Sequence, residues 1–225
     1  MSEFYSEHSR FYVSVDVMIF GFDNKDLKLL IGRRKMNPGR GEWALYGGFV
    51  RPDESVDDAA KRTLYALTGL KDVYMRQAGA YGAVNRDPGA RVISVAYFVL
   101  IDVKDYDERQ QEMYDLQWFD VYHLPPLFSD HQQMVDKAMR MMRKRLSVEP
   151  MIINLLPELF TLTQFQTVYE AISGKVQDKR NFRKKIQEMD FIEKTDKVDK
   201  TMSKRGASLW RFNRDLYELH PEFKL

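Results

Sequence analysis

One segment of the chain, residues 178–191, carries the kinds of side chains that read DNA. At helical spacing, its apolar residues Phe182, Ile186 and Met189 fall on one side. The other side carries the polar residues Arg180, Arg183, Lys184 and Gln187. Arginine can donate two hydrogen bonds to guanine, glutamine can read adenine, and lysine can neutralise a phosphate. The pattern predicts a helix that enters the major groove of DNA, with a solvated amphipathic helix as the alternative.

Positive charge is concentrated around this segment. Residues 175–205 contain 11 Lys and Arg against 6 Asp and Glu, whereas the whole chain has a net charge of +2. The expected loop 194–205 carries lysines and an arginine that could lie along a phosphate backbone. We therefore predict double-stranded DNA as a partner. The predicted DNA-binding residues are Lys179, Arg180, Asn181, Arg183, Lys184, Gln187, Lys204 and Arg205.

A second candidate for chemistry is Asp16, a carboxylate within an otherwise apolar and β-branched run, residues 11–20. The alternation of this run indicates a strand in which Asp16 is buried. Burying a carboxylate costs several kcal/mol unless it is hydrogen-bonded. A polyhydroxy ligand could supply those bonds, with Trp43 or Tyr46 as a stacking face.

The alternative is that Asp16 pairs with an internal arginine, Arg33 or Arg91, and only braces the sheet. The sequence does not decide between these two roles. If the carboxylate belongs to a small-molecule site, we expect other polar and aromatic side chains around it. The predicted effector-binding residues are Ser14, Asp16, Arg33, Trp43, Tyr46, Tyr81, Arg86 and Arg91.

The composition excludes several kinds of site. The chain has 225 residues and 0 cysteines, which excludes disulfides, thiolate zinc sites and cysteine nucleophiles. The 4 histidines show no metal-ligand spacing, so we expect no metal site and no cofactor. No apolar run approaches the roughly 20 residues that span a bilayer, and no signal peptide is visible. We therefore expect a cytoplasmic protein without a membrane partner.

The elements that would position these side chains fall into two parts. The first, residues 1–148, mixes strands and helices, which favours an α/β or α+β domain. Its expected strands are 11–20, 27–31, 42–50 and 91–103, and its expected helices are 54–67 and 130–146.

The second part, residues 149–225, begins near Pro150 and is mainly helical. Thr163 and Asp178 can each cap the N-terminus of a helix. Two short β-like runs follow, 191–194 and 208–212, joined by the charged loop. This order is typical of a winged helix-turn-helix domain and strengthens the DNA-binding interpretation.

Residues 41–70 (GEWALYGGFVRPDESVDDAAKRTLYALTGL) resemble the Nudix box. Gly48 is followed after five residues by Glu54 and after seven more by Arg62, with Gly69 further on. The resemblance covers about residues 10–145 and implies a Nudix-like α/β/α sandwich. In that family, glutamates of the box helix bind the divalent cations used to hydrolyse nucleoside diphosphates linked to another group.

This sequence departs from the box at the glutamate positions, which hold Thr63, Ala66 and Leu67. Alkyl groups such as those of Ala66 and Leu67 cannot coordinate Mg²⁺, which needs hard oxygen ligands. We therefore expect no catalytic residues and no enzyme activity. The alternative is a degenerate hydrolase that uses Asp53, Asp57 or Asp58.

Residues 155–189 resemble the linker and helix-turn-helix of Nudix-related transcriptional regulators. That resemblance implies a homodimer that binds operator DNA through a winged helix domain and senses a small molecule through an inactive Nudix-like domain. The sequence is most similar to the L-arabinose-responsive regulators of Bacteroides-type bacteria, which implies a repressor of sugar-utilisation genes. An ADP-ribose-responsive regulator of NAD metabolism is the alternative, since residues 81–97 resemble the ADP-ribose branch of the Nudix family. Effector binding is expected to release DNA through residues 130–146 and the linker 150–157.

Overall fold

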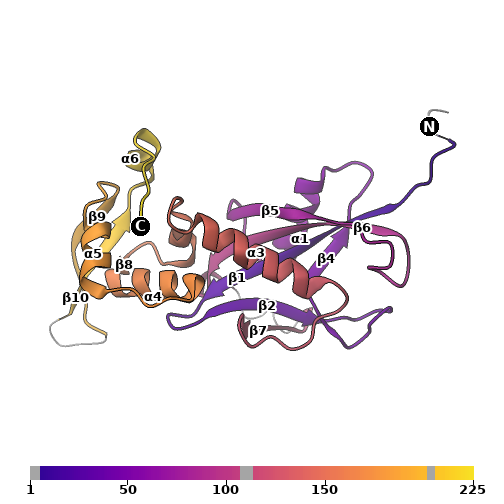
Figure 1. Cartoon of the computed structure of the whole chain (residues 1–225), viewed down its shortest axis with the longest axis horizontal. Coiled ribbons are helices and arrows are strands. Elements are labelled where there is room, and N and C mark those ends of the chain that lie inside the picture. Colours follow the sequence, from indigo (N-terminus) through magenta and orange to yellow (C-terminus); the bar gives the residue numbers. More distant parts are fainter. Residues whose placement is uncertain (1–5, 107–113, 202–205) are drawn as a thin grey trace.

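The computed structural model describes residues 6–106, 114–201 and 206–225. Within these residues, the N-terminal part holds a 7-stranded mixed sheet with the order β3-β2-β1-β6-β5, in which β4 also pairs with β1 and β7 with β2 (Figure 1). The strands are β1 (Tyr12–Phe22), β2 (Leu27–Arg33), β3 (Trp43–Ala44), β4 (Tyr46–Phe49), β5 (Tyr74–Tyr81), β6 (Val92–Asp102) and β7 (Leu116–Asp120).

Two helices cover opposite faces of this sheet, α1 (Val56–Thr68) and α3 (His131–Arg145). The alternation along β1 sends Val15, Val17 and Ile19 into one apolar cluster with α1. It sends Met18, Phe20 and Phe22 into another cluster with α3. The result is the expected α/β/α sandwich, in which Asp16 shares the α3 face with Met18 because the side-chain period of a strand is two.

The C-terminal part contains two consecutive helices and a small antiparallel sheet of order β8-β10-β9. Its elements are β8 (Phe160–Thr161), α4 (Leu162–Ser173), α5 (Lys179–Gln187), β9 (Ile192–Asp199), β10 (Ala207–Phe212) and α6 (Arg214–Leu219). Two 3-10 turns complete the described chain, η1 (Val103–Asp105) and η2 (Met151–Leu155). The helices followed by a hairpin form the expected winged helix-turn-helix, so the α+β architecture is confirmed.

Several local expectations need correction. Helix α4 is capped by Thr161 rather than Thr163, because Thr161 and Gln164 form a reciprocal capping box. The single strand expected at 42–50 is two strands, β3 and β4, which pair with different neighbours on either side of Leu45. Strands β5, β7 and β8 and helix α6 were not predicted from the sequence.

The segment between the two parts is itself part of the core. Met142 of α3, Ile152 of η2 and Phe165 of α4 are each 0% exposed and belong to one apolar cluster. Helix α3 lies beside both the sheet and α4 in Figure 1. The C-terminal part therefore packs directly on the α3 face of the sandwich. Among the described residues, no helix has the length and apolar character needed to cross a membrane.

Candidate functional site

The surviving residues of the box brace a loop against α1. The Arg62 guanidinium donates hydrogen bonds to both carboxylate oxygens of Glu54, from Nε at 2.9 Å and from Nη2 at 2.6 Å. Nη2 also donates to the backbone carbonyl of Phe49 at 3.0 Å. The bond to Arg62 is the main reason that the pKa of Glu54 falls to about 2. These contacts give both residues a structural role.

The residues at the box's glutamate positions do not fit a divalent cation. Thr63 and Leu67 are buried, and Ala66 is a bare methyl group on the surface. The buried Thr63 hydroxyl has no hydrogen-bond partner among the described residues. Within the residues that the structure describes, no group of three or more His, Asp or Glu side chains could hold a metal ion.

Of the three carboxylates that could replace the box glutamates, two already form hydrogen bonds within the protein. Asp57 accepts a hydrogen bond from the Tyr97 hydroxyl, and burial together with this bond raises the pKa of the Tyr97 phenol. Asp58 belongs to the capping box of α1 with Ser55. Asp53 is exposed. We therefore derive no metal-dependent step from this site.

Asp16 lies at the centre of a buried polar network on the α3 face, where only 7% of the residue is exposed. Its Oδ2 accepts a hydrogen bond from Ser94 Oγ at 2.5 Å and faces Arg86 Nη2 at 3.6 Å. Its Oδ1 faces His131 Nε2 at 3.7 Å. The pairing with Arg33 or Arg91 considered from the sequence is wrong, because Arg86 reaches this position instead.

Arg86 ties the loop 82–91 to the start of α3. Its Nε and Nη2 donate to the two carboxylate oxygens of Asp130 at 2.9 and 2.8 Å. Asp130 occupies the N-cap position of α3 but makes no side-chain cap bond, since its carboxylate is held by Arg86. Ser129 Oγ also donates to the Arg86 carbonyl. This arrangement joins the start of α3 to the Asp16 carboxylate.

His131 completes the network, although its sequence position did not predict a place in this site. Its Nδ1 accepts a hydrogen bond from the backbone N–H of Leu45 at 3.0 Å. A backbone N–H can only donate, so the ring proton must lie on Nε2, which faces Asp16. Burial lowers the pKa of His131, although the nearby Asp16 and Asp130 act in the opposite direction. The ring is therefore a neutral link between β1, α3 and the β3–β4 junction.

Arginine side chains stack on aromatic rings beside this network. The Arg34 guanidinium lies 4.0 Å from the ring centroid of Phe128, and Phe128 meets His131 edge-on at 5.7 Å between centroids. In the same way, Arg33 lies 3.9 Å from the ring centroid of Trp43. The neighbouring loop, residues 34–41, carries two further exposed cations, Lys35 and Arg40. Positive charge is therefore concentrated at this end of the sheet.

The basic loop 34–41 meets the loop 82–91. A Cβ added to Gly89 would lie 3.3 Å from Pro38 Cδ, so the two loops are in contact there. Arg86 of the second loop belongs to the Asp16 network, and Arg34 of the first packs against Phe128 beside that network. The loop 82–91 and the N-terminus of α3 therefore contact Asp16, and the loop 34–41 packs beside them.

The structure brings some predicted effector residues together and separates others. Asp16 and Arg86 share the buried network, and Ser14 is buried on the same face of β1. Tyr81 lies against α3, with its hydroxyl 3.5 Å from the Gln133 carbonyl. The other four make different contacts. Arg33 stacks on Trp43, the Arg91 guanidinium lies 5.2 Å from the ring centroid of Phe11, and Tyr46 meets Tyr114 at 5.5 Å between ring centroids. Tyr46 packs with the α1 cluster and so lies on the opposite face from Asp16.

The proposed recognition helix is α5, which is capped by Asp178 as predicted. Phe182 and Ile186 are buried, and Phe182 packs on Tyr169 of α4 at 4.9 Å between ring centroids. Most of the predicted DNA-binding residues on α5 are exposed, namely Lys179, Arg180, Asn181, Lys184 and Gln187. Lys204 and Arg205 lie outside the described residues.

Arg183 differs from the other polar residues of α5. Its Nη2 donates a hydrogen bond to Thr163 Oγ1 of α4 at 2.7 Å. Its Nε is buried and has no partner among the described residues. Arg183 therefore links the two helices of the motif as well as facing the outside.

Comparison with known proteins identifies both parts of the chain. Residues 10–138 match the NUDIX domain family, and residues 152–212 match the NrtR DNA-binding winged helix domain. The ADPR responsive transcriptional repressor NtrR of Acinetobacter baylyi is 32% identical over 92% of this chain and 84% of its own length. The ADP-ribose pyrophosphatase of Methanocaldococcus jannaschii is 34% identical over 58% of this chain and 77% of its own.

The solved structures agree with this result. The crystal structure of Shewanella oneidensis NrtR complexed with a 27mer DNA superposes with a TM-score of 0.83 and 25% identity, covering 95% of this chain and 97% of that chain. A Nudix domain followed by a winged helix domain is therefore established. The expected similarity to L-arabinose-responsive regulators finds no support in these relatives.

Proposed function

This chain belongs to the family of NrtR-type repressors, which are DNA-binding proteins with a Nudix sensor domain, and we propose from this premise that its effector is ADP-ribose. The genes that it controls would then be those of NAD metabolism, which the sequence analysis gave as the alternative to sugar utilisation. The relative from Acinetobacter baylyi, which responds to ADPR, supports this choice.

The observation that carries the proposal is the positive charge beside Asp16. Arg33 and Arg40 are exposed on or next to the loop 34–41, and Arg34 stacks on Phe128 nearby. A diphosphate presents oxygens that suit the planar donor groups of arginine. L-arabinose is uncharged and offers these cations no negative charge. A ribose hydroxyl could in turn bond to the Asp16 carboxylate.

We place the transmission path along α3. At its beginning, Asp130 is bonded to Arg86. Near its end, Arg143 Nε donates to the Ile172 carbonyl at 3.0 Å. The Tyr122 hydroxyl donates to the neighbouring Ala171 carbonyl at 2.5 Å. Both carbonyls belong to the last turn of α4, just before the turn that leads to α5.

A diphosphate that attracts Arg86 would weaken its bond to Asp130 and change the position of α3. The shift would reach α4 through the contacts of Arg143, and so reorient α5. We propose that two copies pair and present their α5 helices about one helical turn of DNA apart. Coupling of about 1–3 kcal/mol would lower operator affinity roughly 5- to 150-fold.

We also propose that the protein does not hydrolyse its effector. Ala66 and Leu67 offer no oxygen to a divalent cation, and Thr63 offers only a buried hydroxyl. ADP-ribose incubated with the protein and Mg²⁺ should therefore be recovered intact.

Direct binding tests this proposal before any operator is known. Calorimetry on the full chain should detect ADP-ribose binding and no L-arabinose binding. Arg40→Gln should weaken ADP-ribose binding, whereas Lys61→Gln, which removes an exposed cation from α1, should not. Binding of L-arabinose alone would overturn the effector assignment. Chromatographic detection of AMP would overturn the claim that the domain is inactive.

A further inference from the structure

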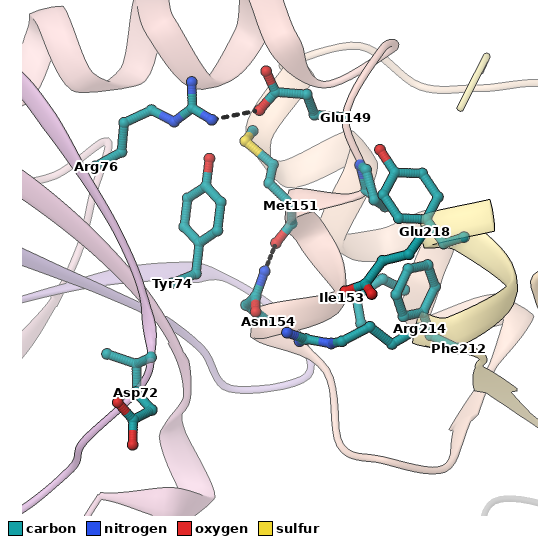
Figure 2. A pocket seen from close by; sticks show the side chains of 13 residues that line it. Asp72, Tyr74, Arg76, Glu149, Met151, Ile153, Asn154, Phe212, Arg214 and Glu218 are labelled. Carbon is teal, nitrogen blue, oxygen red and sulfur yellow. Dashed lines mark hydrogen bonds and ion pairs between the residues drawn. The ribbon is translucent and has the colours of Figure 1, made fainter. Parts of the chain in front are cut away.

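A cavity of about 560 Å³ lies between the two parts of the chain and shares no lining residue with the Asp16 network (Figure 2). Its walls come from the beginning of β5, from the linker around η2, and from the junction of β10 with α6. This volume lies within the range of about 300–1,000 Å³ that is usual for small-molecule sites. A molecule bound here would touch both domains at once.

Aromatic rings form opposite sides of the cavity. Tyr74 belongs to the sheet of the Nudix domain, whereas Phe212 and Tyr217 belong to the winged helix domain. Each side is held by an aromatic neighbour from its own domain, since Tyr74 packs near Phe98 at 6.1 Å and Tyr217 packs on Phe191 at 5.1 Å between ring centroids. The rings are therefore fixed surfaces on which a planar or apolar group could rest.

The charged residues of the cavity fall into two groups. Glu149 is neutralised, because Arg76 Nη2 lies 3.2 Å from its Oε2 and Arg145 also donates to its carboxylate. Asp72, Arg214 and Glu218 are exposed and form no ion pair within 4.0 Å among the described residues. Charges of both signs are thus available beside the aromatic walls.

We propose that this cavity binds a small zwitterion of amino-acid size that carries an aromatic ring. Its carboxylate would bond to Arg214, its ammonium group to Glu218 or Asp72, and its ring would lie against Tyr74 or Tyr217. A simple anion would meet two unpaired carboxylates, and a simple cation would meet the unpaired Arg214. A ligand with both charges would pair with Arg214 and with a carboxylate at the same time.

Such a ligand would act as a second regulator, because it bridges the sensor domain and the DNA-binding domain. Its binding would favour the arrangement of domains in which this cavity is formed. The regulatory effect of the ligand rests on the proposed function, whereas binding of the zwitterion in the cavity does not.

Three related probes dissect the charge requirement in calorimetry on the full chain without DNA. L-phenylalanine carries both charges, 3-phenylpropionate lacks the ammonium group, and 2-phenylethylamine lacks the carboxylate. We expect L-phenylalanine to bind at least about tenfold more tightly than either of the others. Arg214→Gln should weaken L-phenylalanine binding by about the same factor, and Glu218→Gln should weaken it as well. Lys144→Gln removes an exposed cation from α3 and should change nothing.

Several results would overturn the proposal. These are no binding of L-phenylalanine at millimolar concentration, equal binding of 3-phenylpropionate, or full binding by the Arg214→Gln variant. An operator-binding assay then tests the consequence separately. If L-phenylalanine binds but leaves operator affinity unchanged, the site stands and its regulatory role is refuted. Failure of ADP-ribose to release DNA would affect only the proposed function.

Discussion

Replacing Arg86 with glutamine should destabilise the Nudix domain, because it leaves two buried carboxylates without their cation. The side chains of Arg86 and Asp130 are 5% and 12% exposed, and that of Asp16 is 11% exposed. Removing one partner of a buried ion pair costs about 3–5 kcal/mol. Since each carboxylate keeps some contact with water, we expect the lower end, a loss of about 3 kcal/mol in the free energy of unfolding.

Urea denaturation followed by circular dichroism measures this loss. The double variant Arg86→Gln/Asp130→Asn should recover part of the stability, because it removes the unpaired charge of Asp130 as well. The matched control is Arg211→Gln, which breaks the contact between Arg211 and Glu193. That contact is 2.7 Å long, against 2.8 Å between Arg86 and Asp130, but its side chains are 56% and 28% exposed. It should cost no more than about 1 kcal/mol.

If Arg86→Gln costs no more stability than the Arg211→Gln control, the buried ion pair does not stabilise the domain as proposed. The prediction fails in that case. It also fails if the losses of Arg86→Gln and Asp130→Asn simply add in the double variant, since independent effects would mean that the two side chains do not stabilise each other.

Three further predictions follow from other contacts. The pKa of Glu54 is about 2 in the folded protein, below its ordinary value of 4.5. The stability from its bond to Arg62 is therefore present above pH 4.5 and is lost as the pH falls toward 2. When the pH is lowered over this range, the urea midpoint of Glu54→Gln should fall less steeply than that of the unchanged protein. Thr163→Val and Arg183→Gln should each weaken operator binding by about fivefold, and the double variant should bind no more weakly than either single variant. If Arg183→Gln instead reduces the slope of log affinity against log salt concentration by about 1, Arg183 contacts a phosphate. Arg143→Gln should reduce the effect of ADP-ribose on operator affinity while leaving calorimetric binding of ADP-ribose unchanged; an unchanged effect would remove Arg143 from the path.

The features that were predictable from the sequence are those fixed by local spacing. The alternation in β1 identified its buried faces, and the helical spacing of Phe182 and Ile186 identified the buried side of α5. Short strands such as β3 and β8 have two residues each and leave no periodic signal. For this reason, the break between β3 and β4 at Leu45 and the third strand of the small sheet were not predicted.

The candidate effector site was only partly predictable because its contacts join distant parts of the chain. Asp16 and Ser94 are 78 residues apart, and Arg86 and Asp130 are 44 apart. Side-chain chemistry indicated that Asp16 needs a partner, but several arginines could have supplied it. His131 gave no sequence signal, since a lone histidine in the first turn of a helix has many ordinary roles.

We propose above all that ADP-ribose controls DNA binding by this protein. The most direct test is fluorescence anisotropy with labelled DNA from upstream of neighbouring NAD and sugar-use genes, at fixed salt, with ADP-ribose and L-arabinose titrated separately. We predict specific binding that ADP-ribose weakens roughly 5- to 150-fold and that L-arabinose does not change. Release by L-arabinose alone, or specific binding that ADP-ribose leaves intact, would contradict this account.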